Sequence, residues 1–271
     1  MPVSDQDGTA IWRRRTRNES LLRWFGWLLG VAIFAVCWQR ISESTTWFFV
    51  WDAPRIAGDI WSRATPPRWE YITQLGRPIW DTLNIATLGT MISLCLAVPV
   101  AFLAARNTTP SALFVRPLAL FVIVATRSIN SLIWALLLIA IIGPGVFAGV
   151  VAIAIRSIGF CAKLLYEAIE EIDHAQVEAI TATGASRWQV MAYGIVPQIM
   201  PAFAGIAVFR WDINVRESTV LGLVGAGGIG LQLSASLNVL AWPQVSLILL
   251  VILVAVVLGE WVSAKVRGAI I

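Results

Sequence analysis

Residues 178–197 read EAITATGASRWQVMAYGIVP and separate two strongly apolar parts of the chain. Apolar blocks of about 20 residues are long enough to cross a membrane as helices. The stretch between them carries polar side chains and glycines, so we expect it to form a loop in water. A polar loop between two such blocks predicts a multi-pass membrane protein.

The residues that lead into this loop have the pattern of a capped helix. Asp173 can accept hydrogen bonds from the free N–H groups of a helix start, and Gln176 can bond back to it. Gly184 supplies the left-handed residue that ends many helices. The pattern predicts a short helix from His174 to about Thr183.

A second capped helix is expected after the glycine. Ser186 and Gln189 repeat the capping spacing, and Pro197 and Pro201 disturb the helix that follows. Two helices joined by a glycine turn form a compact unit that could sit in a groove of a partner protein.

The composition of the whole chain agrees with a membrane location. The 271 residues are 58% hydrophobic and 13% charged, whereas an ordinary soluble domain is about 25% charged. The 14 tryptophans also fit, because indole rings favour the membrane–water interface. A net charge of +4, one histidine and three separated cysteines give no reason to expect a nucleic-acid partner, a metal centre or a disulfide framework.

The apolar blocks predict an all-α membrane protein with about six transmembrane helices. The predicted spans are 22–41, 79–105, 117–142, 146–165, one that starts after residue 201, and 243–263. Polar residues interrupt the third, which is therefore one long or broken helix. Basic residues before the first span and after the last place both termini in the cytoplasm.

The spans divide the chain into four parts. These are a cytoplasmic N-terminal tail (1–21), a first transmembrane helix (22–41), an extracytoplasmic segment (42–78) and a transmembrane domain (79–265). Within the transmembrane domain, residues 166–197 form a loop that the count of spans places in the cytoplasm.

This loop resembles the EAA loop of bacterial ABC-transporter permeases of the binding-protein-dependent importer type. The family pattern is Glu-Ala-Ala, three residues, Gly, nine residues and Ile-x-Leu-Pro. The matching residues are Glu178, Ala179, Gly184 and Pro197, and the departures are Ile180, Gly194 and Val196. The resemblance implies that the matching residues, with Arg187, couple this chain to separate ABC ATPase subunits. It also implies the type I importer fold and no catalytic activity, with ATP and magnesium bound by the ATPase.

Four stretches of the transmembrane domain resemble the phosphonate-type ABC permeases. They are residues 127–130, 143–149, 164–172 and 210–230. The resemblance implies an importer of phosphonates or related phosphorus oxyanions, built as a homodimer in the bacterial inner membrane. An extracytoplasmic phosphonate-binding protein would deliver the solute.

Charged and polar residues in or beside the spans are candidates for a substrate pathway, because such groups in a membrane usually face a cavity or a partner. The candidates are Arg127, Asn130, Ser131, Arg210 and Arg216. Arginine forks and neutral donors suit a phosphonate dianion.

Structural roles without any contact to substrate stay open for several of these charged residues. Arg127 could extend to the lipid headgroups, and we expect Arg156 to do so. Asp212 and Arg216, four residues apart on a helix, could form a structural ion pair with no role toward substrate.

A glycine-rich run near the C-terminal end is predicted to form a gating turn near the pore entrance. Its glycines are Gly225, Gly227, Gly228 and Gly230, and they permit close approach of backbones and large dihedral changes. The run lacks the Lys and Ser/Thr of a phosphate-binding loop, so we expect no nucleotide site there.

Three alternative functions stay open. One is a permease of the same architecture for phosphate, phosphite or another small solute. Another is an intramembrane enzyme, which is poorly supported because no nucleophile and base have a suitable spacing. The third is a membrane scaffold, which would need no EAA-like loop.

Overall fold

The computed structural model describes residues 3–6, 9–12 and 17–270. The chain divides into two compact units, Met1–Ser62 and Arg63–Ile271, and each is described by itself. In the described residues, all regular structure apart from one short hairpin is helical, as the all-α prediction requires.

The first unit begins with the hairpin, which the sequence analysis did not predict. β1 (Val3–Gln6) pairs antiparallel with β2 (Thr9–Trp12). α1 (Arg17–Ser44) follows, and its most apolar window contains no buried residue. A helix that is apolar on all sides and unburied in the protein is typical of a membrane span surrounded by lipid.

α2 (Trp47–Ala64) has one charged face and one apolar face. Its charged residues Asp52, Arg55, Asp59 and Arg63 are spaced by three or four positions, so they lie on one side of the helix. The remainder is rich in aromatic and aliphatic residues. This pattern is typical of a helix that lies in the membrane interface.

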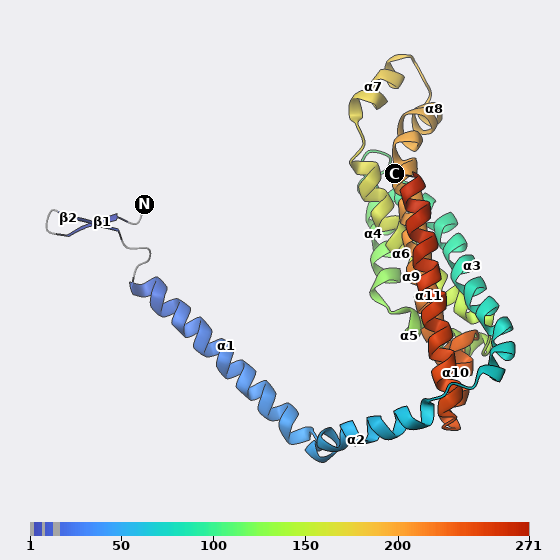
Figure 1. Ribbon diagram of the computed structural model, residues 1–271. Helices are drawn as coiled ribbons and strands as arrows, with labels where there is room; N and C mark the ends of the chain where they lie inside the picture. Colours follow the sequence, from blue (N-terminus) through green and yellow to red (C-terminus); the bar gives the residue numbers. More distant parts are fainter. Residues whose placement is uncertain (1–2, 7–8, 13–16, 271) are drawn as a thin grey trace. The chain divides into compact units, whose positions relative to one another are not determined.

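The second unit is a helical bundle with a loop that contains two short helices at one end. Its elements are η1 (Trp69–Tyr71), α3 (Ile72–Ala104), α4 (Val115–Ser128), α5 (Ser131–Ile142), α6 (Val146–Glu170), α7 (His174–Ala182), α8 (Arg187–Val190), the π-helix η2 (Met191–Ile195), α9 (Val196–Leu221), η3 (Gly222–Val224), α10 (Ile229–Asn238) and α11 (Trp242–Ile270). Figure 1 shows α3, α6, α9 and α11 running lengthwise, with α7 and α8 at one end and α10 near the other.

The number of spans agrees with the prediction of about six. Five helical segments of the described chain are long and apolar enough to cross a membrane. The pair α4 and α5, which bend by 87° at a short break, makes a sixth if the two helices count as one span. This confirms a broken helix within residues 117–142. α3 begins at Ile72, so the second span extends into the segment that was predicted to be extracytoplasmic.

α6 lies at the centre of the bundle because small residues let its neighbours approach. It packs against α3, α4, α5 and α9. A Cβ atom added at Gly159 would lie 2.5 Å from the carbonyl oxygen of Ile123 on α4. On the α3 side, a Cβ added at Gly89 would lie 2.7 Å from Cγ2 of Ile153. Close approach of this kind is how membrane helices gain packing energy in the absence of a hydrophobic driving force.

Candidate functional site

The predicted helix in the polar loop is present as α7. The Asp173 side chain accepts a hydrogen bond from the N–H of Ala175 at 2.9 Å, which confirms it as the cap. Gln176 was predicted to accept a hydrogen bond from the N–H of Asp173, but a residue distant in the sequence accepts it instead. The N–H of Asp173 donates to Oε1 of Gln198, on α9, at 2.9 Å.

The glycine turn and the second helix start are also as predicted. Gly184 has φ +81°, in the left-handed region, and apart from its chain neighbours no described residue has an atom within 4 Å of the position where its Cβ would be. The N–H of Ser186 donates to Oε1 of Gln189 at 2.8 Å, as in a capping box. The loop is therefore held by local hydrogen bonds and leaves its tip open to solvent.

α7 rests on the π-helix η2 at a glycine. Gly194 is buried, and a Cβ at this position would lie 3.4 Å from Cδ1 of Ile180 and 3.6 Å from Cα of Val177. Both are ordinary van der Waals distances, so a methyl group would fit at this contact. Gly194, which departs from the EAA pattern, thus lies where the two arms of the loop pack together.

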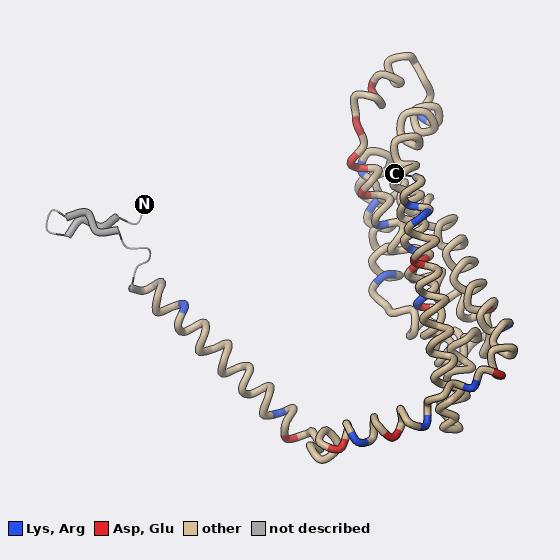
Figure 2. Tube along the Cα trace, in the orientation of Figure 1, with Lys and Arg blue, Asp and Glu red and all other residues tan. Residues whose placement is uncertain are grey.

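All five residues assigned to ATPase coupling lie on the surface of the loop. Glu178, Ala179, Gly184, Arg187 and Pro197 are each exposed. Figure 2 shows acidic residues gathered along the chain that leads from α6 into α7. The loop thus presents accessible groups of both charges to a partner.

Sequence analysis did not assign two large aromatic residues of this loop. Trp188 is 78% exposed and Tyr193 is 72% exposed. Aromatic side chains in a polar loop are the signal that could have identified them, because exposed aromatics are enriched at protein interfaces. Trp188 also lines a cavity of about 800 Å³ between the loop and the end of α3, with Phe102 and Val177.

The base of the loop is anchored to the connection between α3 and α4. Oε1 of Glu170 accepts a hydrogen bond from the N–H of Arg106 at 2.9 Å and lies 3.6 Å from Nη2 of Arg116. Nδ2 of Asn107 donates to the carbonyl of Ile169 at 2.6 Å. A displacement of the loop would therefore reach both α6 and the α3–α4 connection.

A second polar site lies inside the bundle, where α6 faces α9. Arg156 of α6 forms an ion pair with Oε1 of Glu217 on α9. The other oxygen of Glu217 lies 3.6 Å from Nη2 of Arg210. One carboxylate thus stands between two guanidinium groups.

Arg210 is fixed by a chain of buried side chains. It is 2% exposed, and its Nε donates to Oγ of Ser157 at 2.9 Å. Ser157 donates to Oδ1 of Asn214 at 3.3 Å, and Nδ2 of Asn214 donates to Oγ1 of Thr90 at 2.7 Å. The guanidinium carbon lies 5.0 Å from the centre of the Phe160 ring, a cation–π contact. The chain joins α3, α6 and α9.

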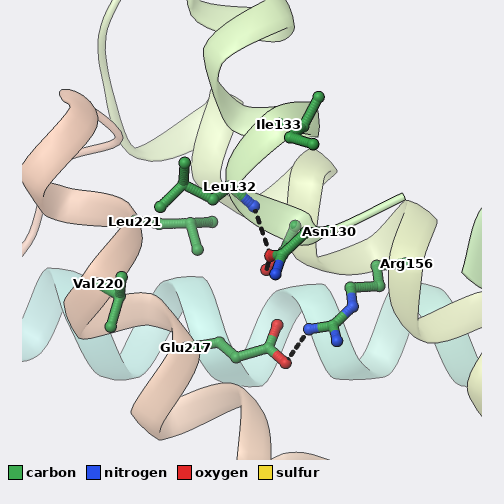
Figure 3. A pocket seen from close by; sticks show the side chains of 8 residues that line it. Asn130, Leu132, Ile133, Arg156, Glu217, Val220 and Leu221 are labelled. Carbon is green, nitrogen blue, oxygen red and sulfur yellow. Dashed lines mark hydrogen bonds and ion pairs between the residues drawn. The ribbon is translucent and has the colours of Figure 1, made fainter. Parts of the chain in front are cut away.

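The ion pair of Arg156 and Glu217 lines a cavity of about 440 Å³. The cavity also reaches the break between α4 and α5, where Asn130 and Ser131 line it. Oδ1 of Asn130 caps α5 by accepting from the N–H of Leu132 at 3.1 Å. Figure 3 shows the ion pair and the capped end of α5 around the same space.

The structure brings only part of the predicted substrate set together. Asn130 and Ser131 line the cavity. Arg210 does not line it, but it contacts Glu217, which does. Arg216 pairs with Asp212, as the spacing predicted, and neither residue lines the cavity. Arg127 is exposed and does not line it.

Sequence analysis missed the central pair of the cavity. The expectation that Arg156 extends to lipid headgroups is wrong, because it pairs with Glu217 within the bundle. The available signal was one base within the apolar segment of α6 and a charged cluster that contains Glu217 on α9, because charged groups in a membrane usually pair with one another.

The glycine-rich run forms a tightly packed turn. Gly225, Gly227 and Gly228 have φ of +100°, +84° and +72°, whereas Gly230 lies inside α10. A Cβ at Gly228 would lie 2.5 Å from Oγ1 of Thr82, and one at Gly230 would lie 2.8 Å from Cα of Gly222. The turn therefore needs glycine both for backbone conformation and for close packing.

Comparison with known proteins decides the family. A model described as "Binding-protein-dependent transport system inner membrane component" matches residues 73–267. The chain belongs to this family. It is a multi-pass permease subunit of an ABC importer in the bacterial inner membrane, and it catalyses no reaction itself. The ATPase is a separate subunit, and a binding protein is the other general partner of such importers.

Relatives of known name cover most of the chain. The phosphite transport system permease protein PtxC of Stutzerimonas stutzeri is 38% identical, over 93% of this chain and 94% of that protein. The phosphate-import permease protein PhnE of Mycolicibacterium smegmatis is 35% identical, over 91% of this chain but 46% of that protein. PhnE2 of Escherichia coli K12, named for a cryptic phosphonate transport system, is 39% identical over 43% of this chain and 95% of that protein.

Solved structures confirm the fold. The inward-facing MetNI methionine ABC transporter matches with a TM-score of 0.64 at 21% identity, over 74% of this chain and 98% of that chain. An amino acid ABC transporter crystallised with histidines matches with a TM-score of 0.63 at 20% identity, over 74% and 95%. At this identity the likeness establishes the type I importer permease fold and nothing about the solute.

Proposed function

We propose that this chain is the permease of an importer for phosphorus oxyanions, the class that contains phosphite, phosphonates and phosphate. The observation that carries the proposal is the similarity to a phosphite permease over 93% of this chain and 94% of that protein. Relatives named for phosphate and for phosphonate transport support the same ligand class. All of these solutes are small anions with several oxygens on phosphorus.

The cavity between α5, α6 and α9 has suitable chemistry for such a solute. Arg156 offers a planar fork that can bind two oxygens at once. Asn130 and Ser131 offer neutral polar groups, and the start of α5 adds the positive end of a helix dipole. Arg210 adds a second positive charge behind Glu217.

The working unit in this proposal is a homodimer with the pore on its two-fold axis. Each α7–α8 loop docks on one ATPase subunit, which binds ATP and magnesium, and a binding protein for phosphorus oxyanions delivers the solute from outside. Closure of the ATPase dimer moves the two loops together, and α6 and α9 transmit the motion to the cavity. The permease thus supplies two conformations whose populations ATP and solute shift.

The test is ATP-dependent uptake of radiolabelled phosphite into vesicles that hold this chain, its ATPase and its binding protein. Methylphosphonate, phosphate and sulfate serve as competitors. We expect phosphorus oxyanions to block uptake and sulfate to have no effect, and the order of the competitors ranks the ligands within the class. Equal competition by sulfate, or no uptake of any phosphorus oxyanion with all three components present, would contradict the proposal.

A further inference from the structure

Two cations and one anion meet at the cavity, and the contacts of the two cations differ. Arg210 is almost fully buried and also bonded to Ser157 and stacked on Phe160. Arg156 is partly exposed, lines the cavity, and has Glu217 as its only ion-pair partner in the described part of the chain. Arg210 is therefore held in place by contacts other than Glu217, whereas Arg156 is accessible from the cavity.

The contact between Glu217 and Arg210 is incomplete. Oε2 of Glu217 and Nη2 of Arg210 are both buried, lie 3.6 Å apart, and have no hydrogen-bond partner among the described residues. Buried charged groups with unmet hydrogen bonds are costly. A small rotation of Glu217 toward Arg210 would satisfy both groups, but it would leave Arg156 without a counter-ion.

We propose that Glu217 is an exchangeable counter-ion that occupies the place of the transported anion on Arg156. An oxyanion that enters the cavity takes over the Arg156 fork, and Glu217 turns to complete its pair with Arg210. When the cavity opens to the cytoplasm, Glu217 returns to Arg156 and displaces the anion. Binding in the membrane is thereby kept weak, so the solute is released rather than retained.

This inference rests on the proposed function for the identity of the anion, and on the geometry for the exchange. The carboxylate competes with the solute for one guanidinium, so its removal should tighten binding in the cavity. Because two opposite charges at close range interact strongly in a poorly solvated site, we expect an effect of roughly tenfold.

The experiment measures binding of radiolabelled phosphite to the permease–ATPase complex in lipid nanodiscs, without nucleotide or binding protein. We expect Glu217→Gln to bind phosphite roughly tenfold more tightly than wild type. The double variant Arg156→Gln/Glu217→Gln should lose this gain. In the complete transporter, Glu217→Gln should also show a lower maximal uptake rate, because release becomes slow.

Asp212→Asn is the matched control, since it removes a carboxylate from an Arg pair on the same helix that does not line the cavity. It should bind phosphite as wild type does. Unchanged binding of both phosphite and radiolabelled sulfate by Glu217→Gln, or an equal gain with Asp212→Asn, would overturn the exchange. If Glu217→Gln does not assemble, Glu217→Asp withdraws the carboxylate by one methylene, and unchanged binding of both anions by that variant would overturn the exchange equally.

Failure of the exchange and failure of the proposed function give different results. If Glu217→Gln gains affinity for sulfate but not for phosphite, the exchange stands and the phosphorus-oxyanion assignment fails. If the wild-type transporter imports phosphite but Glu217→Gln binds it no more tightly, the function stands. In that case Glu217 only joins α6 to α9.

Discussion

At the residue scale, Asn214 shows how apolar helices accommodate a polar network. It is fully buried on α9 and bonds to Ser157 of α6 and to Thr90 of α3. A primary amide donates and accepts at once, so one side chain can serve two hydroxyl groups on different helices. The network also reaches Arg210, which places a buried charge at a defined distance from Glu217.

Replacing Asn214 with Ala should destabilise the bundle. The change leaves buried hydroxyl groups short of a partner, at a cost of about 1–3 kcal/mol. We expect a lower thermal midpoint for the purified permease in detergent. Thr219→Ala is a suitable control, because that hydroxyl donates only within its own helix, to the carbonyl of Arg216. Equal midpoints for Asn214→Ala and wild type would disprove a stabilising role for the network.

At the scale of elements, the α7–α8 loop is a unit set by its own caps, by the packing of α7 on η2 and by hydrogen bonds between Asp173 and Gln198 of α9. Asp173 and Ser186 begin its two helices, and Gly184 turns the chain between them. Gln198 bonds to the backbone N–H of Asp173, which ties the start of α7 to the start of α9. A force on the loop would therefore be passed to α9 and not be lost in a flexible connection.

Gly184→Val should lower uptake and separate ATP hydrolysis from transport. Valine at φ +81° is strained by roughly 1–2 kcal/mol, so the turn would open and the angle between the two helices would change. The measurement is solute imported per ATP hydrolysed in vesicles. Gly184→Asn is the matched control, because asparagine tolerates the left-handed region. Normal coupling in Gly184→Val would argue against a role of this loop in transmitting force.

At the scale of the whole molecule, the loop end carries an exposed aromatic surface. Trp188 and Tyr193 are both mostly exposed, and large aromatics at the centre of an interface provide much of its binding energy. The proposed ATPase partner would cover this surface and fill part of the cavity beside Trp188.

Trp188→Ala should weaken the complex with the ATPase. Removal of a central tryptophan costs on the order of 2 kcal/mol of binding free energy, which is about a thirtyfold weaker affinity. Co-purification and titration of the ATPase onto permease in nanodiscs would measure it. Trp261→Ala, which removes another exposed tryptophan, on α11, should bind the ATPase normally. Full affinity in Trp188→Ala would place the docking surface elsewhere.

Much of this protein could be predicted from the sequence, because the features depend on residues close together in the chain. The apolar blocks specify the spans by their length, and the caps at Asp173 and Ser186 act within three residues. The pair of Asp212 and Arg216 follows from one turn of a helix. Such features need no knowledge of how the helices pack.

Only the tertiary structure decided which charges meet. Arg156 and Glu217 are 61 residues apart, and their local sequences do not say which charge each of them meets. The packing of α6 against α9 brings them together, and the 87° bend between α4 and α5 carries Asn130 to the same cavity. A charge in an apolar span must find its partner across the bundle, and the partner is determined by helix packing.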